Sequence, residues 1–285
     1  MRRAPIHLVV VLAGAVCVHG ARPVALQQSP STAEPIHRPF DQILDLYVRD
    51  GLVYYLALRS ERARLDRYVS SLNVPEATYA GWARDRQLAF WLNAYNAFTL
   101  QTVINHYPIR GKSPGYPSAS IRQIPGAFDR TKHRAAGRSL TLDEIERTVL
   151  PAFDEPRVYL ALGRGAVGSG RLRSEAFSGD RLAPQLDAVA ADFLTQDQML
   201  KIDRDAGTMS VTPILSWREA EFVAAYDKGA DGPYAQRSPL ERALLAFIAP
   251  RRLPLEKEFV QRNGFRVRFL EFDWRLNDLT GGRVE

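Results

Sequence analysis

The sequence predicts an α+β fold: a single, mostly helical domain around a buried central helix, completed by a small antiparallel sheet. Three observations support this prediction. The long segment 86–107 is apolar on nearly every side, shorter amphipathic segments precede and follow it, and a few short stretches alternate like strands. Because no linker interrupts these segments after Arg38, we expect residues 39–285 to form one globular domain.

The central segment, RQLAFWLNAYNAFTLQTVINHY, is long enough for about six turns of helix and contains neither Gly nor Pro. A helix that is apolar all round belongs in the middle of a domain. Asn93 and Asn96 interrupt it and, three residues apart, lie on one face. Buried amides must find hydrogen-bond partners, so these two either tie down the backbone of crossing loops, the commoner role, or line a binding site.

The N-terminal segment 1–20 is typical of a signal peptide, with a basic start, an apolar stretch over 6–18 and small residues before the cleavage point. The apolar stretch is too short to span a membrane comfortably, and no transmembrane segment is expected after cleavage. Cleavage after Gly20 would remove Cys17, the only cysteine, and leave an exported protein, periplasmic or secreted, without disulfides. The following segment 21–38 is polar and punctuated by Pro, and it is expected to be a flexible leader.

Shorter elements flank the central helix on both sides. Amphipathic helices are predicted over 40–48 and 60–72, with a short extended segment over 52–58 between them. A loop rich in Gly, Pro and Ser follows the central helix over 111–118, either as a mobile lid or as a surface excursion. One helical turn is then expected over 121–128.

The middle of the chain combines a capped helix with a glycine-dense turn. Thr141 and Glu144 have capping-box spacing, which predicts a helix from there to about Leu150. The run RVYLAL, 157–162, is predicted to be a buried strand that leads into the turn 163–170. This turn lacks the Lys-Ser/Thr pair and the following helix of a phosphate-binding loop, so we expect a tight, backbone-limited loop.

Both helices and strands are predicted for the C-terminal part of the chain. An amphipathic helix over 182–194 precedes a hairpin formed by 199–203 and 208–212. A helix over 238–248 begins with a capping box and a proline, and the segment 265–272 alternates like a half-buried strand.

Composition and charge exclude several functional classes. Apolar residues make up 46% of the chain and charged residues 25%, as in an ordinary globular protein. The net charge of +6 is not concentrated in any run with interleaved aromatics, so no nucleic-acid binding is expected. The histidines left after cleavage, His37, His106 and His133, are not closely spaced, so neither a metal site nor a cofactor is expected.

Several separate motifs carry a family resemblance. They are YV at 47–48, GLVYY at 51–55, AFWLNAYN at 89–96, HYP at 106–108, LTLDEIE at 140–146, DEPR at 154–157, LRSEAF at 172–177 and FDWRLN at 272–277. In this order they resemble the domain of unknown function 547 family, from about Phe40 to Asn277. The resemblance implies a shared fold, usually in exported or multi-domain proteins, and no established reaction.

The chain departs from the family pattern at the positions where similar members carry cysteine and histidine. Similar members usually carry two cysteines in the loop after the Pro-Arg segment, where this chain has Arg164 and Ser169, and a histidine where it has Arg147. A cysteine near a histidine would be a candidate thiolate–imidazole arrangement. Arginine cannot serve as a base, since its guanidinium stays protonated. The resemblance therefore implies a degenerate site, and we expect a non-catalytic binding domain, a pseudoenzyme, rather than an enzyme.

A serine-based enzyme is the alternative. Ser169 would be the nucleophile of a hydrolase or acyl transferase, with His106 at the end of the central helix as its base. His37 lies in the expected leader and His133 in a basic stretch expected to be exposed, so neither is favoured as that base.

The arginines point to an anionic ligand. If the loop that carries Arg164 meets the helix that carries Arg147, several guanidiniums face one space, and Arg173 follows closely. They then need carboxylate partners, such as Glu146 or Glu175, or an acidic ligand or protein partner, since guanidinium groups bind carboxylates and phosphates in a bidentate manner. The alternative is that these arginines point away from one another into solvent, where most arginines lie. The candidate ligand-binding residues are Arg147, Arg164, Arg173, Glu175, Asn93 and Asn96. An Arg173–Glu175 pair that only braces the loop is the structural alternative.

Overall fold

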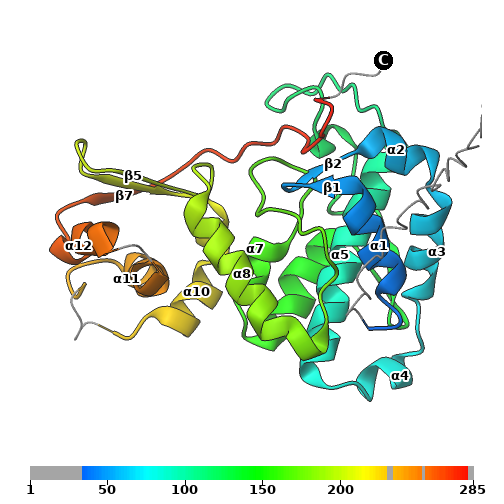
Figure 1. Ribbon diagram of the computed structural model, residues 1–285, viewed down its shortest axis with the longest axis horizontal. Helices are drawn as coiled ribbons and strands as arrows, with labels where there is room; N and C mark the ends of the chain where they lie inside the picture. The colour runs from blue at the N-terminus through cyan, green and yellow to red at the C-terminus, as the bar shows by residue number, and fades with distance from the viewer. Residues whose placement is uncertain (1–33, 230–233, 252–253, 282–285) are drawn as a thin grey trace, which may run out of the picture. The chain divides into compact units, whose positions relative to one another are not determined.

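A computed structural model describes residues 34–229, 234–251 and 254–281 of the protein, and helix α5 (Arg84–His106) is its centre (Figure 1). Every residue from 88 to 100 is buried. Helices α2, α3, α6 and α8 all contact α5, so the prediction of a central buried helix is confirmed. None of the described helices is long and apolar enough to cross a membrane.

The N-terminal helices cover one side of α5 (Figure 1). The elements are α1 (Arg38–Tyr47), β1 (Val48–Arg49), β2 (Leu52–Val53), α2 (Tyr55–Ser60), α3 (Ala63–Ser71) and α4 (Glu76–Ala80). The predicted extended segment 52–58 is correct only at β2. From Tyr55 the chain is helical, because Tyr55 and Leu58, three residues apart, then share one buried face.

The segment before α1 corrects the expected leader, 21–38. Residues 1–33, including the predicted signal peptide, lie outside the described residues, but residues 34–38 pack against the domain. Glu34 pairs with Arg86 at 2.6 Å, and the fully buried His37 lies 2.8 Å from the Tyr68 hydroxyl through Nδ1. Burial, and secondly the charge of Arg86, lowers the pKa of His37 to about 3. This histidine is therefore an internal anchor.

The segment after α5 holds a hairpin that the sequence did not predict. The elements are η1 (Ile121–Gln123), β3 (His133–Ala135), β4 (Arg138–Leu140), α6 (Leu142–Glu144), η2 (Ile145–Val149) and η3 (Leu150–Phe153). His133 was expected to be exposed, yet it is 8% exposed and stacks on Phe98 at 4.4 Å between ring centroids. The predicted capping box of Thr141 and Glu144 is confirmed, with both hydrogen bonds present.

The expected strand 157–162 is instead a single helical turn, α7 (Val158–Ala161). A short apolar run that is buried on all sides carries no periodicity, so its pattern fits a strand and a buried helical turn equally well. The turn is closed by three successive backbone hydrogen bonds, in which the amides of residues 158, 159 and 160 donate to the carbonyls of residues 155, 156 and 157. The chain then enters the glycine-dense loop 163–170.

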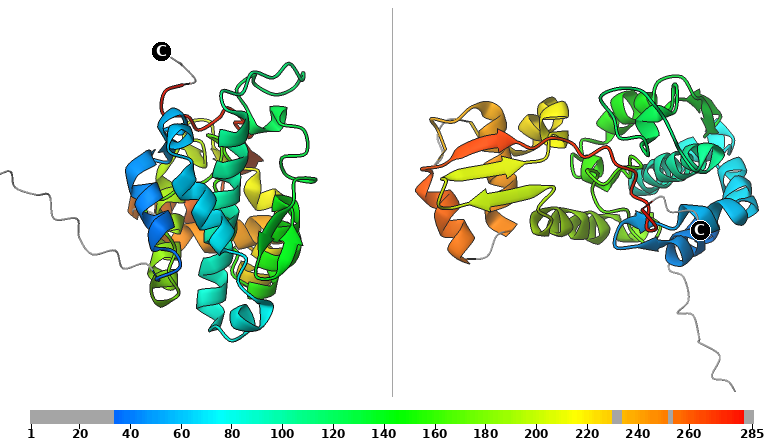
Figure 2. Two further views of the ribbon diagram at one scale, coloured as in Figure 1. Left: turned by 90° about the vertical axis from the view of Figure 1, so that its right-hand side faces the viewer. Right: turned by 90° about the horizontal axis from the view of Figure 1, so that it is seen from above.

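The remaining elements form the C-terminal part. They are η4 (Gly179–Arg181), α8 (Leu182–Thr195), β5 (Leu200–Asp203), β6 (Thr208–Val211), α9 (Ile214–Trp217), α10 (Glu219–Tyr226), α11 (Pro239–Ile248), η5 (Ala249–Arg251), α12 (Pro254–Arg262) and β7 (Arg266–Phe269). Strands β5 and β6 form the predicted antiparallel hairpin, but β7 pairs with β6 in parallel (Figure 2). The α+β prediction is confirmed, whereas the expectation of a purely antiparallel sheet is wrong.

Candidate functional site

A cavity of about 410 Å³, here called the arginine pocket, collects charged and aromatic side chains from separate parts of the chain. Its lining residues are Arg122, Phe128, Asp143, Glu146, Arg147, Arg164, Trp217, Arg218 and Trp274. The capped segment α6–η2 and the loop after α7 therefore meet, and they bring Arg147 and Arg164 to one space. Of the candidate ligand-binding residues, the pocket contains these two.

Arg164 and Glu146 form a buried ion pair in the wall of the pocket. Arg164 Nη2 and Nε donate to the two oxygens of Glu146 at 2.7 and 3.2 Å, and Nη1 donates to the carbonyl of Tyr159 at 3.1 Å. The side chains are 3% and 13% exposed. Burial alone would raise the pKa of the Glu146 carboxyl, but the charge and hydrogen bonds of Arg164 outweigh burial and hold that pKa below its ordinary value. The pair is therefore charged and mutually satisfied.

Arg218 is only partly satisfied. Its Nη2 donates to the Tyr159 hydroxyl at 3.0 Å and to the carboxylate of Glu221, and its guanidinium lies over the Tyr159 ring. The Nε of Arg218 is buried and has no hydrogen-bond acceptor among the described residues. A buried N–H group without an acceptor is costly.

Arg122 and Arg147 form no ion pair with any carboxylate in the part of the chain that the structure describes. Arg122 is instead held by aromatic rings, 4.2 Å above the centroid of Trp274 and 4.6 Å above that of Phe128. A guanidinium stacked on ring faces keeps its N–H edge available for hydrogen bonds in its own plane. Two guanidiniums are therefore available to an anion.

Besides its arginines, the pocket is lined by the carboxylate of Asp143 and by a cluster of aromatic rings. The carboxylate of Asp143 has neither an ion pair nor a hydrogen-bond donor within the described residues. Trp217 is 45% exposed and packs on Phe272 and Trp274, with ring centroids 5.0 and 6.3 Å away. The pocket thus offers cations, one acceptor and an exposed aromatic surface.

The candidate catalytic residues Ser169 and His106 are not hydrogen-bonded to each other in the described structure. Ser169 is 4% exposed, and its Oγ accepts a hydrogen bond from the Arg164 amide at 3.1 Å. His106 is exposed, and its Nδ1 lies 3.0 Å from the carbonyl of Thr102. No hydrogen bond connects Ser169 to a histidine in the described ranges. Its hydroxyl therefore serves to close the loop.

The amides of Asn93 and Asn96 bind backbone and do not line the pocket. Asn93 donates to the carbonyl of Phe177 at 2.8 Å and accepts from its amide at 2.9 Å. Asn96 accepts from the amide of Gly163 at 2.8 Å and donates to the carbonyl of Ala161 at 3.3 Å. These two residues tie crossing loops to α5, which was the structural alternative, and their assignment to a ligand site is not supported.

Replacing Asn93 with leucine is expected to lower the free energy of unfolding by about 2–6 kcal/mol, because two buried backbone groups of Phe177 lose their partners at about 1–3 kcal/mol each. Thermal and urea denaturation would measure the change. Asn105→Leu, at an exposed position of the same helix, is the control and should cost much less. An Asn93→Leu protein as stable as that control would show that the amide is not needed for the loop.

Arg173 and Glu175 lie outside the arginine pocket and brace the loop that follows it. Arg173 donates to Glu175 at 2.5 and 3.1 Å, and Arg181 pairs with the same carboxylate at 3.2 Å. The carboxylate of Asp192 is 3.9 Å from Arg173. Their charges are therefore used within the protein, as the structural alternative proposed.

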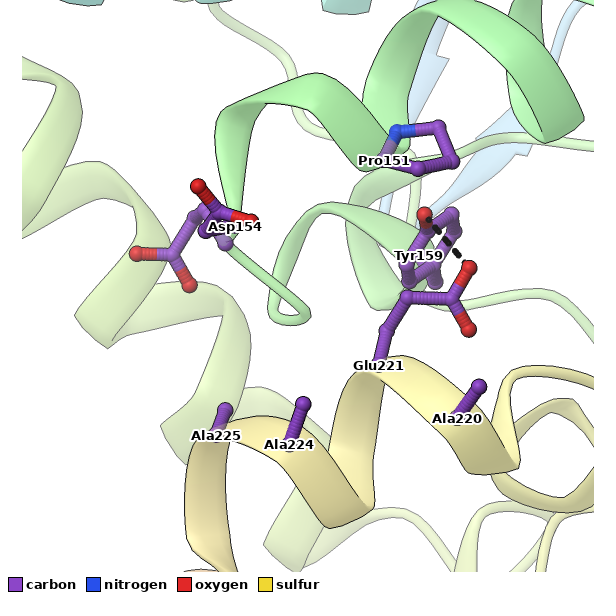
Figure 3. A pocket seen from close by; sticks show the side chains of 8 residues that line it. Pro151, Asp154, Tyr159, Ala220, Glu221, Ala224 and Ala225 are labelled. Atoms are coloured by element: carbon purple, nitrogen blue, oxygen red, sulfur yellow. Dashed lines mark hydrogen bonds between the residues drawn. The ribbon is translucent and has the colours of Figure 1, made fainter.

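A second cavity, of about 470 Å³, lies between α7 and α10 (Figure 3). Its lining residues are Pro151, Asp154, Glu155, Tyr159, Ala220, Glu221, Ala224 and Ala225. The carboxylates are each paired with an arginine: Asp154 with Arg84, Glu155 with Arg157, and Glu221 with Arg218. This cavity therefore offers no unpaired charge, although Tyr159 and Glu221 connect its wall to the arginine pocket (Figure 3).

In the part of the chain that is described, no group of three or more His, Cys, Asp or Glu side chains could hold a metal ion. The sequence missed six lining residues: Arg122, Phe128, Asp143, Trp217, Arg218 and Trp274. The sequence contains a Trp-Arg pair at 217–218 and another at 274–275, and this repeated pair is the feature that could have indicated a site. Only the fold shows that Trp217 and Trp274 share a pocket.

Comparison with known proteins gives a family for the middle of the chain. The family model described as "Protein of unknown function, DUF547" matches residues 79–194, a shorter range than the motifs spanned. This range contains α5 and the elements that carry Arg122, Arg147 and Arg164. No curated protein and no solved structure matches the chain. The similarity to the DUF547 family therefore covers residues 79–194 of the chain.

Proposed function

We propose that the protein is an exported, non-catalytic binding domain whose arginine pocket holds an anionic ligand. The observation that carries the proposal is the pair Arg122 and Arg147, two guanidiniums in one cavity without an ion-pair partner among the described carboxylates. Arginines of this kind are relieved by a carboxylate or phosphate, which they bind through two parallel hydrogen bonds.

The same arrangement argues against the serine alternative. Ser169 would need a base to lose its proton, and its Oγ instead accepts the Arg164 amide inside a tight loop. Arg147, which stands where similar members carry a histidine, cannot remove a proton at neutral pH. The pocket therefore suits binding better than conversion.

Anion binding is expected to depend on Arg147. Calorimetric titration with acetate and inorganic phosphate at constant ionic strength should show binding to the wild type that Arg147→Ala weakens tenfold or more, since a hydrogen bond to a charged group contributes about 1.5–3 kcal/mol. Arg134→Ala removes the same charge from an exposed position on β3 and is the control. Equal binding by all three proteins, or an ester-hydrolysing activity lost specifically in Ser169→Ala, would contradict the proposal.

Export is the second part of the proposal. The basic and apolar order of residues 1–20 supports it, and cleavage after Gly20 would leave Glu34 and His37, the first packed residues described, in the mature chain. N-terminal sequencing of protein recovered from the periplasm or medium should give Ala21 as the first residue. An intact Met1 in that material would argue against export by cleavage.

A further inference from the structure

We infer that the ligand of the arginine pocket is an acidic sugar: a hydroxylated ring that carries a carboxylate, as in a uronic acid. This inference rests on the proposed function and adds the part of the ligand that is not charged. It uses three features of the pocket that a bare anion would leave without a role: its size, Asp143 and Trp217.

The size of the cavity indicates more than an ion. At about 410 Å³ it lies within the range of small-molecule pockets, roughly 300–1,000 Å³. Its guanidiniums do not surround its whole surface, because Phe128, Trp217 and Trp274 line the rest. A ligand that fills the space therefore has an anionic group and an apolar face.

The half-buried carboxylate of Asp143 favours a ligand that donates hydrogen bonds. An ionised carboxylate only accepts, and within the described residues this one has no donor. Acetate and an aromatic acid such as benzoate have no donor to offer at neutral pH. Sugar hydroxyls do, and each can at the same time accept a hydrogen bond from Arg147 or Arg218. Asp143 would repel a second anionic group, so the acid of the ligand belongs beside Arg122 and Arg147.

Trp217 supplies a surface for the ring. An indole that is 45% exposed within a cavity is a large apolar contact area, and its packing on Phe272 and Trp274 holds its orientation. The C–H face of a pyranose ring is apolar, whereas its edge carries the hydroxyls. A ring lying on Trp217 would therefore direct its edge toward the charged side chains of the pocket.

The test is a calorimetric titration of the full protein with glucuronate, glucose, acetate and benzoate. Glucuronate should bind at least tenfold more tightly than any of the other three, because only it has the ring, the hydroxyls and the acid. Trp217→Ala should reduce glucuronate binding to the level of acetate and leave acetate binding unchanged. Phe269→Ala, which removes an aromatic ring 44% exposed on β7 and outside the pocket, is the matched control and should bind glucuronate like the wild type.

A second variant keeps the inference testable if Trp217→Ala folds poorly. Asp143→Asn should weaken glucuronate binding and not acetate binding. A uronic acid trisaccharide, titrated in parallel, distinguishes a free sugar acid from a chain of them: tighter binding of the trisaccharide assigns the pocket to a chain, and either result supports an acidic sugar.

The two proposals fail in different ways. The inference of an acidic sugar is wrong if glucuronate binds no more tightly than acetate or benzoate, or if Trp217→Ala and Asp143→Asn leave glucuronate binding intact. Neither result contradicts the proposal that the pocket binds anions. If Arg147→Ala binds every acid as well as the wild type does, the proposed function itself is wrong.

Discussion

Alanine at position 170 is expected to lower the free energy of unfolding by about 3 kcal/mol or more, since overpacking costs about 1–3 kcal/mol even where side chains can adjust. A Cβ atom on Gly170 would lie 1.7 Å from the carbonyl oxygen of Leu160. That oxygen belongs to the backbone of α7, and Leu160 itself is 1% exposed, so no side-chain rotation relieves the overlap. Urea denaturation followed by tryptophan fluorescence would measure the loss.

Gly264→Ala is the matched control. The nearest atom to a Cβ atom there is 4.0 Å away and the position is exposed, so this change should be nearly neutral. Loss of soluble protein for Gly170→Ala, with normal yield of Gly264→Ala, would agree with the expectation. Equal denaturation midpoints for the two variants would show that the loop can move away from α7 at little cost.

The elements that the sequence predicted well are those with local signals. Helix α5 is apolar on all sides, and no other position in a domain satisfies such a helix. The capping boxes that open α6 and α11 were predicted because four consecutive residues contain the whole motif. Physical information of this kind lies within a few residues of the element that it specifies.

The errors occurred where the decision depends on distant residues. Strand β7 lies within the predicted segment 265–272, but its parallel direction is set by β6, more than fifty residues earlier. The burial of His133 follows from its stacking on Phe98 of α5, and nothing in its own basic neighbours indicates it. The anchoring of His37 likewise depends on Tyr68.

The site was predicted in part for the same reason. The family resemblance placed Arg147 beside the loop of Arg164, and the structure brings both to one pocket. Trp217 and Trp274 lie outside the segment that matches the family model, whereas Arg122 lies within it. The charged side of the pocket thus comes mainly from the family segment, and the two tryptophans come from the rest of the chain. Under our proposal, the family segment would supply the anion site and the C-terminal part its selectivity.

Replacing Glu146 with glutamine is expected to lower the free energy of unfolding by about 3–5 kcal/mol at neutral pH, because it leaves a buried guanidinium without its counter-charge. Arg164 is 3% exposed and donates two hydrogen bonds to Glu146, so water cannot replace the carboxylate. Glutamine has nearly the same shape, and the loss therefore reports charge rather than packing. The double variant Glu146→Leu/Arg164→Met should recover part of the stability, since removing both charges removes the cost of burying either.

The pH dependence gives an independent check of the same pair. Because Arg164 holds the pKa of Glu146 below its ordinary value of 4.5, the unfolded chain binds the proton more readily than the folded one. The stabilisation is therefore complete above that ordinary value and is lost as pH falls from it through the lower pKa of the folded state. Urea denaturation of the wild type between pH 7 and 3 should show this acid loss, and the same series for Glu146→Gln should lack the share that Glu146 contributes. Parallel pH profiles for the two proteins, or a stability cost for Glu146→Gln no larger than that of Glu144→Gln on the exposed side of the same segment, would mean that Arg164 does not depend on Glu146 for its charge balance.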